Sequence, residues 1–317
     1  MTHTLRRGRR IGSHYLAYSS TGEPLTPREP TSNERIARDG AFARERALAA
    51  WLVARESVLI GYSGGVDSAY LAAVSLETLG AERAIGVIGR SPSYPEAQWA
   101  AAHAVAAQIG LTVREIATNE MDDPRYAANP SNRCYYCKTE LWSQLAPLAL
   151  ELGIATVVDG TNFDDLQGHR PGKAAAREWG VESPLAEVGL TKAEIRLLSE
   201  ARGLPTWDQP SSPCLSSRLP TGTAVTPLRL AKVEAAERAV RALGVRGDLR
   251  VRYHGETARV ELGHDELDAW RSGDPRRALR AAIAGAGFAR VELDLRGFRS
   301  GMTNQPADAE SLDVLEA

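Results

Sequence analysis

Along the first two thirds of the chain, segments with the hydrophobic pattern of a strand alternate with segments that have the pattern of a helix. Short apolar runs with the length of a strand stand at 57–62, Ala84–Ile88, Thr112–Ile116 and Thr156–Asp159. Segments with helical spacing of apolar residues stand at Asn33–Arg55, Ala69–Leu79, Glu96–Ile109 and Lys138–Leu152. This repeated β-α-β order predicts an α/β fold with a doubly wound parallel sheet.

The order of elements changes after Gly222. A long amphipathic helix is predicted at Pro227–Leu243, and two alternating strands follow at Arg250–Tyr253 and Ala258–Leu262. Two more helices are predicted, and then one strand, at Asp265–Arg271, Pro275–Ala284 and Arg290–Leu295. We therefore expect a smaller C-terminal α+β domain behind the first one.

The length of 317 residues fits two domains of ordinary size. Residues 33–221 are predicted to form the first domain and residues 222–300 the second. An arginine-containing segment at 1–32 is expected to be a mobile N-terminal arm, and residues 301–317 a flexible acidic tail.

The composition and the net charge indicate a globular protein and argue against certain binding partners. Hydrophobic residues make up 43% of the chain and charged residues 25%, which is typical of a folded globular protein. The formal net charge of -2 argues against a nucleic-acid partner, since such binding needs a strongly basic surface. No apolar stretch approaches the roughly 18 residues of a membrane span. We expect no membrane partner and a cytoplasmic location.

A glycine-rich segment lies between the first predicted strand and the helix after it. It consists of Ser63, Gly64, Gly65, Val66, Asp67 and Ser68. Adjacent glycines let backbone N–H groups approach an anion, and the start of a helix favours negative charge, so we predict a phosphate-binding loop. The serine hydroxyls are possible donors, and the aspartate either caps the helix or helps to hold a cation. The loop has no lysine, which disfavours a Walker-type loop. The alternative is a strand-to-helix turn without a ligand.

The sequence contains three cysteines. Cys134 and Cys137 form a CxxC pair, and Cys214 lies far downstream. In a reducing compartment such a pair is more often redox, metal-binding or catalytic than disulfide-bonded. Three thiolates are one short of a closed zinc site, but they can hold a [4Fe–4S] cluster and leave one iron open to carry sulfide. The alternatives are three buried cysteines without a ligand, or a zinc site completed by a histidine.

Several basic residues are candidate anion ligands. Ser217 and Arg218 follow the third cysteine closely, and a guanidinium group suits a phosphate. Arg250 and Arg252 lie two positions apart on a predicted strand and therefore point to one face. We predict that these residues bind a nucleotide, with a solvated strand face as the alternative for the last two.

Carboxylates near the phosphate loop are candidate magnesium ligands. Asp67 is the first of these, and Asp164 and Asp165 are weaker candidates that suit helix capping equally well. His169 and His254 are expected in turns or at the surface rather than as a general base, because no nucleophile motif stands beside them.

The phosphate loop resembles the SGGxDS signature of the PP-loop ATP pyrophosphatases. Across most of the chain, further stretches resemble the LarE family of sulfur transferases, which act in the synthesis of the nickel-pincer nucleotide cofactor. They are Ser91-Pro92-Ser93, 133–138, 159–165, 170–172 and 214–218. The chain departs from this family pattern at Ser212-Pro213, and at Thr221, where an aromatic residue is frequent.

The resemblance implies an enzyme that uses ATP and Mg²⁺ to adenylate the carboxylate of a nicotinate-derived mononucleotide, a pyridinium dicarboxylate, and then inserts sulfur. It implies catalytic roles for Asp67, Cys214 and Arg218, and a substrate or sulfur-transfer role for the C-terminal domain. Sulfur from a sulfide or persulfide donor would pass through a [4Fe–4S] cluster held by the three cysteines. In the other mode known in the family, Cys214 gives up its own sulfur. The resemblance also implies a homo-oligomer, namely a hexamer.

Two other functions remain open from the residues alone. A tRNA-thiolating PP-loop enzyme would use the same loop and the same cysteines, but it predicts a basic surface that the net charge does not show. An iron–sulfur carrier or ATP-responsive module without turnover predicts no release of pyrophosphate.

Overall fold

The structure is a computed structural model and describes residues 31–167, 170–299, 304 and 309–312. Nearly all of the predicted N-terminal arm and most of the predicted tail lie outside these residues, as does His169. Within the described part of the chain, no helix is both long and apolar enough to cross a membrane. The cytoplasmic location stays a prediction.

A sheet of four parallel strands forms the centre of the first unit, in the order β3-β2-β1-β4. The strands are β1 (Val58–Gly61), β2 (Ala84–Arg90), β3 (Thr112–Ala117) and β4 (Thr156–Val158). Val58 of β1 pairs with Ala84 on one side and with Thr156 on the other. All pairs are parallel, which confirms the predicted α/β fold class.

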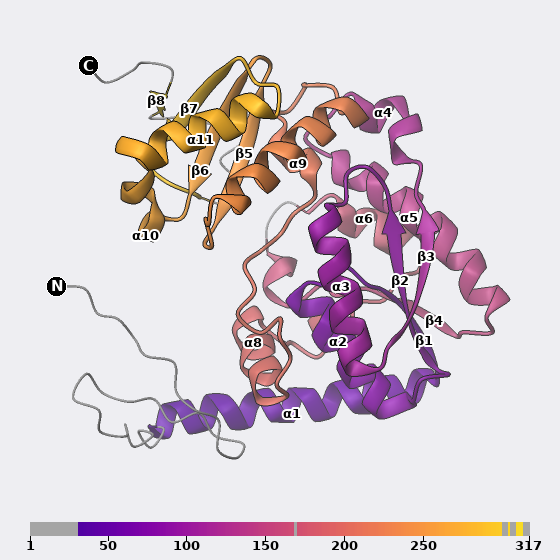
Figure 1. Cartoon of the computed structure of the whole chain (residues 1–317). Coiled ribbons are helices and arrows are strands. Elements are labelled where there is room, and N and C mark those ends of the chain that lie inside the picture. The colour runs from indigo at the N-terminus through magenta and orange to yellow at the C-terminus, as the bar shows by residue number, and fades with distance from the viewer. Residues whose placement is uncertain (1–30, 168–169, 300–303, 305–308, 313–317) are drawn as a thin grey trace.

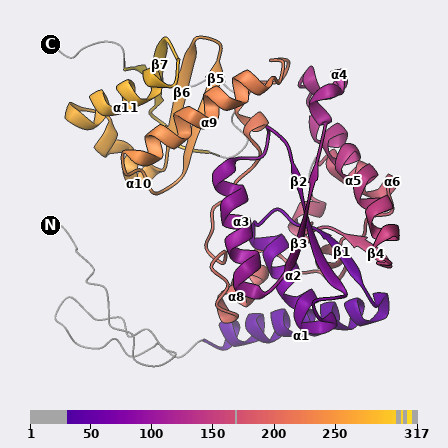
Figure 2. The ribbon, with the colours of Figure 1, turned by 45° about the vertical axis from the view of Figure 1, so that its right-hand side comes forward.

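Helices cover both faces of this sheet (Figures 1 and 2). The longer ones are α1 (Ser32–Arg55), α2 (Val66–Leu79), α3 (Glu96–Ile109), α5 (Arg133–Glu151), α6 (Gly172–Glu178) and α8 (Lys192–Ala201). Short helical turns between them are η1 (Glu120–Asp122), α4 (Pro124–Ala127), η2 (Asp164–Leu166), α7 (Pro184–Glu187) and η3 (Leu215–Arg218). Val58 and Ile60 pack in the core with α1, α2 and α8, whereas Leu59 packs with Trp142 of α5 on the opposite face. Because both faces of β1 are buried, its sequence is a continuous apolar run.

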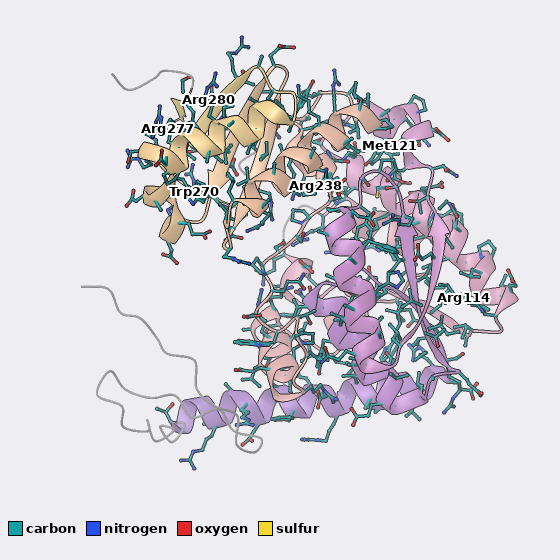
Figure 3. The ribbon with its side chains drawn as sticks, viewed as in Figure 1. Arg114, Met121, Arg238, Trp270, Arg277 and Arg280 are labelled. Carbon is teal, nitrogen blue, oxygen red and sulfur yellow. The ribbon has the colours of Figure 1, made fainter. Side chains whose placement is uncertain are left out.

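The second unit is a mixed sheet in the order β5-β6-β7-β8. Its elements are α9 (Pro227–Ala242), β5 (Leu249–His254), β6 (Thr257–Leu262), α10 (His264–Leu267), η4 (Asp268–Trp270), α11 (Gly273–Gly285), β7 (Arg290–Asp294) and β8 (Ala309–Ser311). Apolar residues of α9 and α11 pack with those of the strands into one core. Arg277 and Arg280 project from the outer side of α11 (Figure 3), so this helix is amphipathic.

The structure corrects several predicted elements. Residues 309–311 of the expected flexible tail form β8, which pairs antiparallel with β7. The helix expected from Lys138 begins five residues earlier, at Arg133. In place of the helix expected at Asp265–Arg271 there is a four-residue α10 followed by a 3₁₀ turn. The domain boundaries at 32, 221 and 300 stay predictions.

The second unit lies beside the end of the first sheet where β2 leads into α3 (Figures 1 and 2). The backbone N–H of Glu96, at the start of α3, donates to Glu234 of α9 at 2.6 Å. The core of the second unit also includes Tyr126 and Leu215, which come from the first unit's side of the boundary. The segment around Cys214 is therefore packed between the two sheets.

The turn from β1 into α2 depends on a glycine at one position. Gly64 has a φ of 68°, and a Cβ atom there would lie 2.4 Å from the Cβ of Ala102 on α3. Its neighbour Gly65 has a φ of -77°, and a Cβ there would meet only the Ser63 hydroxyl, at 3.5 Å. The two adjacent glycines therefore differ in what they tolerate.

We predict that Gly64→Ala lowers the free energy of unfolding by about 2 to 4 kcal/mol, because it adds backbone strain and overpacks α3. Gly65→Ala is the matched control and should cost less than about 1 kcal/mol. Chemical denaturation of both variants measures the difference. Equal stability of the two would contradict this account of the turn.

Candidate active site

The predicted phosphate loop wraps the beginning of α2. The hydroxyl of Ser68 lies 3.2 Å from the backbone N of Ser63 and 3.1 Å from its hydroxyl, so the two serines fix the loop across its base. Tyr94 donates its phenol proton to the carbonyl of Ser63 at 2.9 Å. A Cβ at Gly160 would lie 3.0 Å from the backbone N of Ser68. The absence of a side chain at Gly160 therefore lets the segment after β4 approach the start of α2. The loop is thus held rigidly at a helix N-terminus, the arrangement that binds phosphate.

Asp67, in the first turn of α2, is held by a lysine from a distant element. Lys192 lies in the first turn of α8, and its Nζ is 2.5 Å from Oδ2 of Asp67. The amide of Asn162 donates to the other carboxylate oxygen at 3.4 Å. The loop itself lacks a lysine, but the fold places one beside it. The signal for this helix was present in the sequence, since Thr191 and Glu194 form a capping box at its start.

The two weaker magnesium candidates have structural partners. Asp164 accepts the backbone N–H of Lys192 at 2.8 Å. Asp165 accepts the backbone N–H of Asn162 at 3.3 Å and forms an ion pair with Arg170 at 2.5 Å. Both carboxylates therefore help to shape the segment that presents Lys192 and Asn162 to Asp67.

One cavity connects the phosphate loop with all three cysteines. Its volume is about 290 Å³, and its lining includes Ser63, the first residue of the loop, together with Cys134, Cys137 and Cys214. Such a cavity between a phosphate loop and reactive side chains is the expected form of an active site. Residues from positions 61 to 214 of the chain line this single space.

The three cysteines come from two elements. Cys134 and Cys137 lie in the first turn and a half of α5, where Cys134 is exposed and Cys137 is partly buried. Cys214 directly precedes η3 and is also partly buried. Burial, together with the nearby Glu120, raises the pKa of the Cys137 thiol to about 12. Binding of a metal at this thiol therefore requires the displacement of a proton.

Arg218 anchors the segment that carries Cys214. Its side chain is only 2% exposed and forms a two-point ion pair with Glu237 of α9, at 2.9 and 3.0 Å. The same guanidinium donates to the carbonyl of Pro213 at 2.6 Å, to that of Cys214 at 3.1 Å and to the hydroxyl of Ser217 at 3.1 Å. All three nitrogens of the guanidinium group therefore donate hydrogen bonds. Nucleotide binding by Arg218 and Ser217 stays a prediction.

Arg250 and Arg252 on β5 are buried, so the alternative of a solvated strand face is wrong. Arg252 pairs with Glu261 of β6 and donates to the carbonyl of Ser217 at 3.1 Å. Arg250 donates to the carbonyl of Ser211 at 2.5 Å, and burial and the charge of Arg218 lower its pKa to about 10. Their role in binding an anion is not tested by these contacts and stays a prediction.

Glu120 is a site residue that sequence reasoning missed. It lies in η1, is 2% exposed and borders the same cavity as the cysteines. Its Oε1 accepts hydrogen bonds from the hydroxyls of Ser91 and Ser93, at 2.5 and 2.9 Å. The two serines belong to a stretch with family resemblance, but nothing in the sequence pairs that stretch with a carboxylate 27 residues further on.

His254 is the last residue of β5 and is partly buried, and this burial lowers its pKa.

Comparison with known proteins agrees with this geometry. Residues 50–129, which contain the phosphate loop, match the family model described as NAD synthase. The chain is 44% identical over 250 residues to an uncharacterized protein of Synechocystis, covering 79% of this chain and 92% of that protein. It is 28% identical over 247 residues to an uncharacterized protein of Methanocaldococcus jannaschii, covering 77% of this chain and 92% of that protein.

One relative has an assigned activity and matches most of the chain. The pyridinium-3,5-bisthiocarboxylic acid mononucleotide synthase of Lactiplantibacillus plantarum is 32% identical over 261 residues, which is 82% of this chain and 94% of that protein. The similarity therefore covers most of both chains. The chain belongs to the LarE family of ATP-dependent sulfur transferases.

Proposed function

We propose that this enzyme adenylates the carboxylate of a pyridinium dicarboxylate mononucleotide and then replaces one carboxylate oxygen by sulfur, in the synthesis of the nickel-pincer nucleotide. The supporting observation is the single cavity that borders both the phosphate loop and the three cysteines. The relative from Lactiplantibacillus plantarum is named for the bisthiocarboxylic acid mononucleotide, which supports the same substrate class.

The first step takes place at the phosphate loop. A carboxylate oxygen of the substrate attacks the α-phosphorus of ATP, and pyrophosphate leaves with the electron pair of the broken P–O bond. The N–H groups at the start of α2 and the ammonium of Lys192 would hold the pyrophosphate. Asp67 would bind Mg²⁺ once Lys192 has turned from the carboxylate to the phosphates.

The second step takes place at the cysteine side of the cavity. Sulfide attacks the carbonyl carbon of the acyl adenylate, the bond from this carbon to the AMP oxygen breaks, and AMP leaves with the electron pair. A mixed anhydride reacts where a free carboxylate does not, because AMP is a good leaving group. Both steps act on the same carboxyl group of the substrate, so one cavity that borders both sets of residues suits them.

The three cysteines are the candidate ligands of a [4Fe–4S] cluster. Within the part of the chain that the structure describes, no three His, Cys, Asp or Glu side chains are arranged to hold one ion together. In a cubane each cysteine binds a different iron, and all three cysteines border one cavity. We propose that Cys134, Cys137 and Cys214 hold this cluster, which would supply the sulfide.

The Asp67–Lys192 pair gives a test of the adenylation site. Asp67→Asn and Lys192→Ala should each lower substrate-dependent pyrophosphate release by about 100-fold, because the first removes the proposed Mg²⁺ ligand and the second removes the cation that would hold the pyrophosphate. Iron content should not change, because neither residue borders the cysteines. Lys173→Ala is the control: this lysine binds the carbonyls of Asp165 and Leu166 and not Asp67. Undiminished release in both variants would exclude the pair from the mechanism.

The mode of sulfur delivery is tested with single replacements of the three cysteines by alanine. Each should abolish the cluster, measured as iron and acid-labile sulfide after anaerobic purification, and should abolish sulfur transfer while sparing pyrophosphate release. If Cys134→Ala and Cys137→Ala keep full single-turnover transfer, and Cys214 becomes lighter by the mass of hydrogen sulfide, the sacrificial mode is right instead.

A further inference from the structure

Glu120 presents a buried charge that the proposed reaction does not yet use. Its Oε1 is bound by two serine hydroxyls, but its Oε2 is buried and has no hydrogen-bond partner among the described residues. The residue is 2% exposed and borders the cavity between the phosphate loop and the cysteines. A carboxylate removed from water without a full set of partners costs several kcal/mol, so a fold keeps one where a ligand completes it.

The cations nearest to the cavity do not neutralise this carboxylate. Arg133 borders the cavity, but its guanidinium donates to the side chain of Asn129 and to the carbonyl of Ser216. Lys138 also borders the cavity, and its ammonium lies 4.9 Å from the ring centre of Trp142. Among the described residues, no ion pair involves Glu120. The cavity therefore contains a site for a positive charge that the protein does not fill itself.

The neighbours of Glu120 indicate what kind of cation fits. Tyr126 is 1% exposed, and its pKa is raised mainly by burial, with a smaller contribution from the Glu120 carboxylate nearby. Ile88 and Leu141 belong to the same cavity wall. A cavity lined by apolar side chains and one carboxylate suits a cation whose charge is spread over an aromatic ring, rather than a small hydrated ion that needs several oxygen ligands.

We propose that Glu120 binds the positively charged pyridinium ring of the substrate and selects it over uncharged rings. The inference rests on the proposed function, whose substrate carries such a ring. With the ring nitrogen beside Glu120, the ring lies within the cavity that borders both the phosphate loop and the cysteines. Glu120 thus orients the carboxylate that is adenylated, and Ser91 and Ser93 hold Glu120 in place.

The test compares two ligands that differ in ring charge. Nicotinic acid mononucleotide has a pyridinium ring, and its 1,4-dihydropyridine form has the same ribose phosphate on an uncharged ring. Dissociation constants are measured by calorimetry without ATP. The wild-type protein should prefer the cationic ligand by about tenfold or more, and Glu120→Gln should lose this preference while binding the uncharged ligand as before. Glu120→Asp, which keeps the charge, should retain part of it.

Glu115→Gln is the matched control, because it removes a carboxylate on β3 that does not border the cavity. It should keep the full preference. The proposal is overturned if Glu120→Gln still prefers the cationic ligand, if both ligands weaken equally, or if only the iron content changes. Thermal unfolding of each variant shows whether it is folded. If the wild-type protein binds neither mononucleotide, the proposed function fails as well, whereas loss of selectivity alone leaves it intact.

Discussion

Guanidinium groups that bind main-chain carbonyls hold the Cys214 segment, and the rest of the site depends on this. Arg133 of α5 binds the carbonyl of Ser216, Arg218 binds those of Pro213 and Cys214, and β5 supplies the arginines that bind Ser211 and Ser217. Since an arginine keeps its proton in proteins, each group remains a cation that must stay partnered when buried. A shift of this segment would break several such bonds at once. The position of the third cysteine is thereby fixed relative to α5, which carries the other two.

The second sheet serves the active site by providing the counter-charges for these arginines. Glu237 of α9 accepts both the guanidinium of Arg218 and the backbone N–H of Val251 on β5, so one carboxylate joins the cysteine segment to the sheet. Glu261 of β6 pairs with Arg252, and both side chains are about 5% exposed or less. Removing one member of a buried pair typically costs about 3 to 5 kcal/mol, because the other charge is then left alone. The C-terminal unit therefore stabilises a site whose phosphate loop lies in the other sheet.

The sequence allowed the parallel sheet and the phosphate loop to be predicted, because both are local patterns: apolar runs of fixed period, and glycines between a strand and a helix. It did not reveal that Lys192 meets Asp67, since the two residues are 125 positions apart and only the packing of α8 on α2 joins them. Glu120 was missed for the same reason. The burial of Arg250 and Arg252 could not be predicted either. Arginines at alternate positions of a strand suggest a face exposed to solvent, unless the acidic partner on the next strand is known.

The phosphate loop and the surroundings of the cysteines differ in how their charges are balanced. At the phosphate loop, Asp67 and Lys192 neutralise each other and can separate when a metal ion and phosphates provide new partners. Near the cysteines, burial and the carboxylate of Glu120 raise the pKa of the Cys137 thiol, so Glu120, rather than a thiolate at Cys137, carries negative charge there.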